Sequence, residues 1–77
     1  MLSIKVLGTG CKKCIQLEEN ARKAVELTGV EASIEKVTDL NEIMNYGVMM
    51  TPALVINETV KSVGKLLSPD EIKSFLV

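Results

Sequence analysis

The hydrophobic and polar positions along this 77-residue chain change their spacing several times, and each change predicts a new element. Residues 2–7 combine β-branched residues with partial alternation, which is typical of a strand. From about residue 12 to residue 27, apolar positions recur at steps of three and four, which indicates an amphipathic helix. Residues 31–37 return to the spacing of a strand. The first half of the chain therefore predicts a β-α-β unit.

A short helix and a buried strand are predicted next. Asp39 is the expected N-cap of the helix, with Glu42 completing a capping box, and Gly47 ends it. The apolar run 53–56 has no polar position, as expected for a strand that is buried on both faces. A turn then follows, and residues 60–65 are expected to return antiparallel to that strand.

The last helix has the clearest start signal in the chain. Ser68 is the predicted N-cap, Pro69 occupies the first helical position, and Glu71 closes a capping box. From the helical spacing of its apolar residues, the buried face of this helix is predicted to consist of Ile72, Phe75 and Leu76.

The order β-α-β-α-β-β-α places the chain in the α/β class as one domain, residues 1–77. A β-α-β start implies a parallel pair of strands with a right-handed crossover, and the late hairpin adds an antiparallel strand. The predicted architecture is thus a mixed four-stranded sheet flanked by helices.

Composition narrows the classes of function. Hydrophobic residues make up 47% of the chain and its net charge is −1, which disfavours both disorder and nucleic-acid binding driven by charge. No apolar run is long enough to cross a membrane, and the N-terminus lacks the pattern of a secretory signal. We therefore expect a cytoplasmic protein without a membrane or nucleic-acid partner.

The chemistry is concentrated in Gly8–Cys14, GTGCKKC, which holds both cysteines of a chain without histidine. A disulfide that closes so short a loop removes little entropy from the unfolded chain, so a role as a stabilising structural disulfide explains the pair poorly. Two cysteines also cannot complete a four-ligand structural zinc site. Two functions of the cysteine pair remain to be weighed, namely redox exchange and the binding of a soft metal.

The predicted position of the two thiols favours redox exchange. Cys11 lies where the first helix begins, so its thiolate is favoured by unpaired backbone N–H groups and by Lys12 and Lys13. Gly10, like Gly8, leaves room for another molecule to approach the sulfur. Cys14 falls on the apolar face of the helix. We therefore predict that Cys11 is the attacking nucleophile and that Cys14 resolves the mixed disulfide.

With Thr51-Pro52 placed before a buried strand, the whole chain resembles the small thioredoxin/glutaredoxin-like redox-active disulfide proteins of archaea and bacteria. The resemblance implies a thioredoxin-like fold and a thiol–disulfide oxidoreductase. It also implies that Pro52 is cis beside the cysteines and that the backbone of Thr51 pairs with the bound substrate chain. A cis peptide bond is essentially confined to bonds that precede proline.

The chain departs from typical thioredoxins in several ways. Gly10 and Lys12-Lys13 stand where those proteins have tryptophan and Gly-Pro, and Lys5 stands where they have a buried acid.

Met50, with Met49, offers an adaptable apolar surface for varied targets or else fills the core. Gly64 matches a position near the site where this fold family often has glycine.

The implied partners are protein disulfides as targets and a thioredoxin-reductase-like flavoprotein as electron donor, with the chain acting as a monomer. No cofactor or metal is implied beyond the Cys11–Cys14 disulfide. The alternative is a Cu(I) carrier that binds through both thiolates. Against it, Thr9 replaces the methionine usual in such carriers, Thr51-Pro52 has no role in their fold, and the chain ends in a capped helix.

Overall fold

The computed structural model describes residues 2–10 and 12–76. Its elements are β1 (Leu2–Leu7), α1 (Lys12–Thr28), β2 (Ala32–Val37), α2 (Leu40–Asn45), β3 (Ala53–Ile56), β4 (Thr59–Val63) and α3 (Pro69–Leu76). The predicted order β-α-β-α-β-β-α is confirmed. No helix among the described residues is long and apolar enough to cross a membrane.

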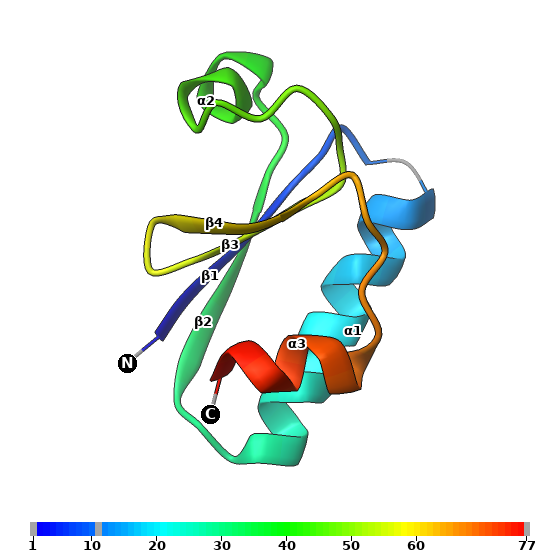
Figure 1. The fold of residues 1–77 in the computed structure, drawn as a ribbon, viewed down its shortest axis with the longest axis vertical. Coiled ribbons are helices and arrows are strands. Elements are labelled where there is room, and N and C mark those ends of the chain that lie inside the picture. The colour runs from blue at the N-terminus through cyan, green and yellow to red at the C-terminus, as the bar shows by residue number, and fades with distance from the viewer. Residues whose placement is uncertain (1, 11, 77) are drawn as a thin grey trace.

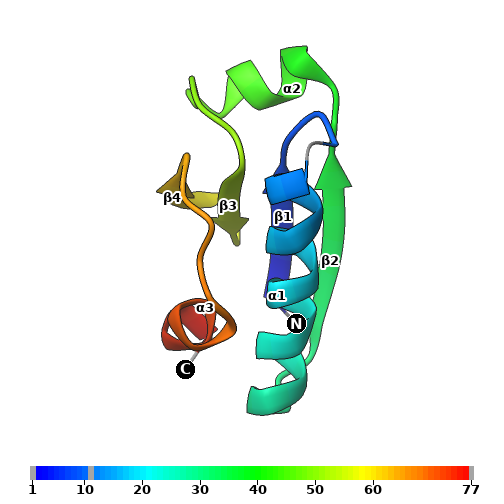
Figure 2. The ribbon, with the colours of Figure 1, turned by 90° about the vertical axis from the view of Figure 1, so that its right-hand side faces the viewer.

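The four strands form one mixed sheet in the order β2-β1-β3-β4. β1 pairs in parallel with β2 and antiparallel with β3, and β3 pairs antiparallel with β4. α1 and α3 lie together on one face of the sheet, while α2 lies at the end where β1 and β2 finish (Figures 1 and 2). This arrangement is the predicted α/β architecture, with β1 and β3 in the centre.

Alternating residues of the central strands supply two apolar clusters, one on each face. Ile4 and Val6 join the buried faces of α1 and α3 in the first cluster. Leu7 packs with Ile43 of α2 and with Val48 in the second. All residues of β3 are buried, as its uninterrupted apolar run predicts. The second cluster is confined to the end of the sheet near α2.

The caps of the helices follow the sequence with one difference. Ser68 Oγ accepts the Glu71 N–H at 3.2 Å and Glu71 Oε1 accepts the Ser68 N–H at 3.1 Å, so the predicted box at α3 is confirmed. Asp39 caps α2, but its carboxylate accepts the N–H of Asn41 at 2.8 Å. Among the described residues, no bond from the Glu42 side chain to Asp39 closes the second box.

The structure differs from the sequence prediction in two details, the burial of Phe75 and the first residue of β4. Phe75 is 40% exposed, so its assignment to the buried face of α3 is wrong, whereas Ile72 and Leu76 are buried. Ile72 and Leu76 belong to the first apolar cluster, where α3 packs against α1, and Phe75 lies outside that cluster. β4 begins at Thr59 because the turn contains only Asn57 and Glu58, both with positive φ, as in a two-residue hairpin.

Candidate functional site

Cys14 lies in the first turn of α1 and is almost fully buried, with 2% of its surface exposed. The inward orientation predicted for it is therefore correct. Lys12 and Lys13 precede it in α1 and are exposed. The first turn of α1 carries no acidic residue, so nothing there offsets the positive end of the helix dipole. Cys11, the predicted nucleophile, lies outside the described residues, directly before the first residue of α1.

Gly8 is the point at which three parts of the site meet. A Cβ at this position would overlap Cys14 Sγ and would lie 3.0 Å from Cys14 Cβ and 3.9 Å from Thr51 Cβ. The Gly8 N–H donates to Val37 O at 2.9 Å, which fixes the end of β1 to β2. The backbone at Gly8 thus lies against both Cys14 and Thr51, and brings the helix start and the proline loop together. The room predicted at Gly8 for another molecule is taken up by Cys14 itself, so that prediction is wrong for Gly8.

The peptide bond between Thr51 and Pro52 is cis, the geometry that the family resemblance implies. Pro52 is fully buried and Thr51 is exposed. Pro52 O accepts the N–H of Gly64 at 2.8 Å, so the end of β4 supports this loop. An exposed Thr51 that shares the neighbourhood of Gly8 with Cys14 suits the substrate-binding role predicted for its backbone, which stays a prediction.

Gly10 and Gly64 both have positive φ, at 95° and 69°. Gly10 is exposed, and a Cβ there would have open space around it, in keeping with the access predicted for this position. At Gly64, by contrast, a Cβ would lie 3.2 Å from both the Cβ and the Cε of Met50. The glycine at position 64 therefore gives the Met50 side chain a surface to lie on.

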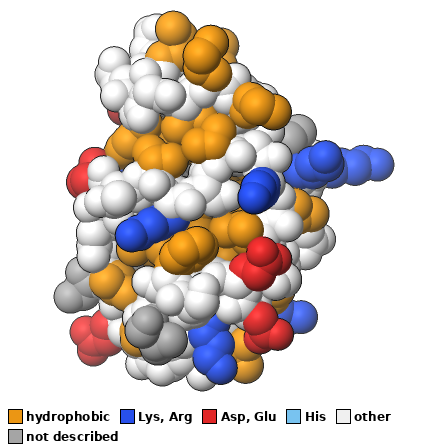
Figure 3. Space-filling model, in the orientation of Figure 1, with side chains coloured by type: hydrophobic (Ala, Val, Ile, Leu, Met, Phe, Trp, Pro, Cys, Tyr) orange, Lys and Arg blue, Asp and Glu red, His pale blue; other side chains and the backbone are white. Residues whose placement is uncertain are grey.

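Met50 is 63% exposed and Met49 is 96% exposed, so neither methionine fills the core. Leu40 and Met44, one turn apart on α2, are also more than 60% exposed. Figure 3 shows hydrophobic side chains gathered over the end of the molecule where α2 and the following loop lie. The apolar surface predicted for Met50 is present, and its use in gripping targets stays a prediction.

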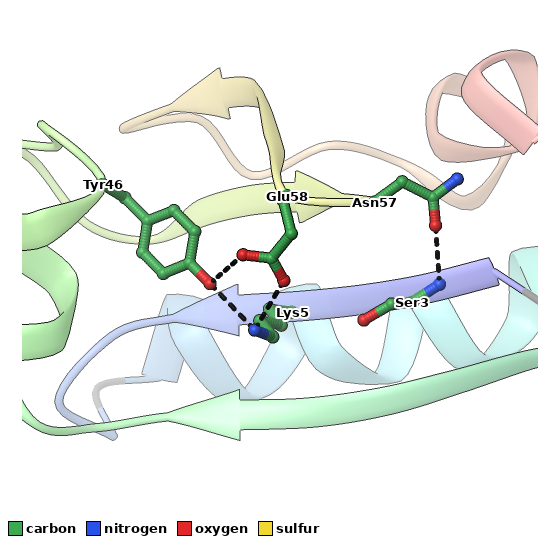
Figure 4. Close-up of polar contacts among 5 residues, drawn as sticks. All are labelled: Ser3, Lys5, Tyr46, Asn57 and Glu58. Atoms are coloured by element: carbon green, nitrogen blue, oxygen red, sulfur yellow. Dashed lines mark hydrogen bonds and ion pairs between the residues drawn. The ribbon is translucent and has the colours of Figure 1, made fainter.

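A polar cluster that was not predicted from the sequence lies on the sheet face away from α1. Lys5 Nζ donates to Tyr46 Oη at 2.9 Å and to Glu58 Oε1 at 2.7 Å, and Tyr46 Oη donates to Glu58 Oε2 at 2.9 Å (Figure 4). We call these three residues the lysine–tyrosine cluster. A pocket of about 370 Å³ lies beside it. One signal was available: Lys5 is the only charged residue in β1, whose other residues are apolar except for Ser3.

The hydrogen bonds of this cluster shift two pKa values in opposite directions. The bonds from Lys5 to Glu58 and to Tyr46 raise the pKa of the lysine above its ordinary value. The bonds that Glu58 accepts, first that from Lys5 and then that from Tyr46, lower the pKa of the carboxylate. Lys5 is thus held as a cation on the face away from α1.

The described residues contain no group of three or more histidine, cysteine, aspartate or glutamate side chains that could hold a metal ion. What they do bring together is a thiol at a helix start, a cis-proline and a mixed four-stranded sheet. A fold and site of this kind define the thioredoxin-like class.

The comparisons with known proteins agree with that class. The sequence model that represents the thioredoxin domain family matches residues 2–77 of this chain. The chain therefore belongs to this family. A thioredoxin of Methanocaldococcus jannaschii is 46% identical over 76 residues, which cover 99% of this chain and 87% of that protein. A thioredoxin of Methanothermobacter thermautotrophicus is 38% identical over 76 residues, covering 99% of both chains. These relatives support a thiol–disulfide oxidoreductase type of function and give no support to the copper carrier.

Proposed function

We propose that this protein is a small thioredoxin that exchanges a Cys11–Cys14 dithiol for the disulfides of other proteins. The observation that carries the proposal is the meeting of Cys14, Gly8 and Thr51, with a cis-proline next in the chain. In this arrangement an extended substrate chain that paired with the backbone of Thr51 would bring its disulfide to the thiols. Membership of the thioredoxin domain family supports the same chemistry.

The reaction takes two exchange steps. The thiolate of Cys11 attacks one sulfur of the target disulfide, forms a mixed disulfide and releases one target thiolate, which takes a proton from solvent. Cys14 then loses its proton and attacks Cys11 Sγ, which releases the second target thiol. The target disulfide gains two electrons, and the two cysteines lose two electrons as they form their own disulfide. No further cofactor takes part.

Burial of Cys14 supports this division of roles, because a sulfur with 2% exposure is poorly placed to meet a protein disulfide. Exposed Lys12 and Lys13 and the open space at Gly10 favour attack by a thiolate at position 11. The exposed methionines 49 and 50 offer an adaptable apolar contact for the target.

A dithiol donor must return the two electrons, and a thioredoxin-reductase-like flavoprotein is the class we propose. Its own dithiol would reduce the Cys11–Cys14 disulfide by the same two exchange steps in reverse. A monomeric state and a cytoplasmic location stay predictions from the sequence.

The first test is an equilibrium redox titration of the full chain, followed by alkylation of thiols and mass measurement. We expect a single two-electron transition with a slope of about 30 mV per tenfold change in the ratio. Insulin reduction with dithiothreitol as donor then tests exchange. Cys14→Ser should trap a mixed disulfide with the target, and Cys11→Ser should not. Failure to form the intramolecular disulfide, or equal trapping by both variants, would overturn the proposal.

A further inference from the structure

The lysine–tyrosine cluster joins three segments that are far apart in the sequence. Lys5 belongs to β1, Tyr46 is the C-cap of α2, and Glu58 lies in the turn between β3 and β4. The three side chains form a closed ring of hydrogen bonds of 2.7 to 2.9 Å (Figure 4). Lys5 also lies 5.6 Å from the centre of the Tyr46 ring. The tyrosine hydroxyl is the one group in the ring that both accepts and donates.

Two of these segments lead directly into the candidate site. Lys5 lies three residues before Gly8, whose backbone lies against Cys14. Tyr46 immediately precedes the segment 47–52, which ends in the cis-proline. The cluster therefore fixes the segment before the proline loop to the strand before the cysteine loop, from the face of the sheet away from α1.

Glu58 occupies an unusual backbone conformation for its residue type. Its φ is 66°, in the left-handed region that most side chains avoid. Its two carboxylate oxygens are both used, one by Lys5 and one by Tyr46. The side chain of Glu58 is 63% exposed and that of Lys5 is 21% exposed. An ion pair this open to water adds little stability, so its clearer effect is to fix the direction of the tyrosine hydroxyl.

We propose that the Tyr46 hydroxyl is a positioning group for thiol–disulfide exchange: bonded to Lys5 and Glu58, it sets the loop 47–52 relative to β1. It thereby sets the distance of Thr51 from Cys14. This inference rests on the proposed exchange function. A protein disulfide must reach the thiols while its chain pairs with Thr51, whereas a small disulfide needs the thiols alone. Loss of the hydroxyl should therefore weaken reaction with proteins selectively.

The kinetic test compares wild type with Tyr46→Phe, which removes only the hydroxyl. The probes are insulin, as a protein disulfide, and 5,5′-dithiobis(2-nitrobenzoate), as a small one. We expect kcat/KM for insulin to fall about three- to ten-fold, mostly through KM, because geometry rather than the thiol is changed. The rate with the small disulfide should stay within about two-fold.

The matched control is Glu18→Gln, which removes one partner of the exposed pair between Glu18 and Arg22 on the surface of α1. It should leave both rates unchanged. Equal losses for the two disulfides in Tyr46→Phe would indicate a general structural effect, and unchanged insulin kinetics would show that the hydroxyl has no role. Either result would overturn the proposal.

A second measurement does not depend on activity. Amide hydrogen exchange of the full chain reports on the N–H of Gly64, which donates to Pro52 O in the proline loop. Tyr46→Phe should speed its exchange by about three-fold or more, while the Ile72 N–H, bonded to Ser68 O in α3, should not change. Unchanged exchange at Gly64 would overturn the positioning role. If wild type does not reduce insulin, the proposed function fails, and this measurement still decides the positioning role.

Discussion

On the α1 side of the sheet, Gly8 and Cys14 meet through backbone and sulfur with no space between them. On the opposite side, Lys5, Tyr46 and Glu58 meet through three hydrogen bonds, of which the two to Glu58 are exposed and the one between Lys5 and Tyr46 is partly buried. The first contact joins the end of β1 to the start of α1, and the second joins β1 to the end of α2, directly before the segment that leads to the cis-proline. They differ in what they tolerate.

Close packing responds to volume, because the surrounding atoms have nowhere to move. Hydrogen bonds between exposed groups respond to charge and pH, and they can be replaced by water at small cost. We therefore expect substitutions on the α1 side to change stability strongly. On the other side we expect small changes in stability and larger changes in how targets are bound.

The largest effect should come from Gly8→Ala. Its Cβ would overlap Cys14 Sγ, and the nearby backbone of β1 is fixed by the bond to Val37 O, so the helix start has to shift. We expect a loss of about 1–3 kcal/mol in the free energy of unfolding, measured with urea and dithiothreitol present. Thr9→Ala, at the exposed neighbouring position, should change it by less than about 0.5 kcal/mol.

A double-mutant cycle with Cys14→Ala sharpens this test. Removal of Sγ takes away the atom with which the new Cβ overlaps, so Gly8→Ala should cost less in the Cys14→Ala background than in wild type. Equal costs in both backgrounds would show that the overlap with sulfur is not the cause.

Gly64→Ala should have the next largest effect. At a φ of 69° an alanine is strained, and its Cβ would also lie 3.2 Å from two atoms of Met50. We expect a loss of about 1–2 kcal/mol by urea unfolding. Combined with Met50→Ala, the loss should shrink toward the strain alone. A loss that does not depend on residue 50 would contradict the contact.

The opposite face should respond to pH. Glu58 has a pKa below its ordinary value of 4.5 when folded, so its contribution is present above pH 4.5 and is lost as the pH falls through the folded value. Lys5 has a raised pKa, so its contribution is complete below its ordinary value of 10.5. The cluster should thus contribute evenly around neutral pH.

Urea midpoints of wild type and Glu58→Gln, followed from about pH 8 down to about pH 3, test this expectation. The gap between the two proteins should be constant near neutral pH and should close in acid. A gap that widens in acid would have the wrong sign for a lowered carboxylate pKa.

The smallest effect should come from Glu18→Gln on α1. Arg22 Nη2 lies 3.3 Å from Glu18 Oε2, and the arginine side chain is 59% exposed. Pairs of this kind contribute about 0.3–0.5 kcal/mol. A loss above about 1 kcal/mol would mean that exposed charge matters here as much as packing.

Regular spacing and local start signals allowed the fold to be predicted. The order of elements, the buried strand 53–56 and the box of Ser68 and Glu71 depend on residues that are close in sequence. Phe75 was misplaced because helical spacing gives the apolar side of α3 but not how much of that side α1 covers.

The site was predicted in part. Cys14 was placed inward by its register with Leu17, and the cis geometry of Pro52 was implied by the family resemblance. The contact between Gly8 and Cys14 could not be predicted, because it depends on how closely the start of α1 packs against the end of β1. The ring around Tyr46 could not be predicted either, because it depends on the register of strands and loops that are distant in sequence. A single sequence does not specify that register.

The sheet order leaves β2 and β4 with unpaired sides, and the pairing of β4 changes register between Leu54 and Val55. Because Ser62 pairs with Leu54 and Val60 with Val55, Lys61 is an extra residue that bulges from the edge. A bulge and an exposed lysine make an outer strand a poor template for another chain. This edge therefore resists the strand-to-strand aggregation to which small open sheets are prone.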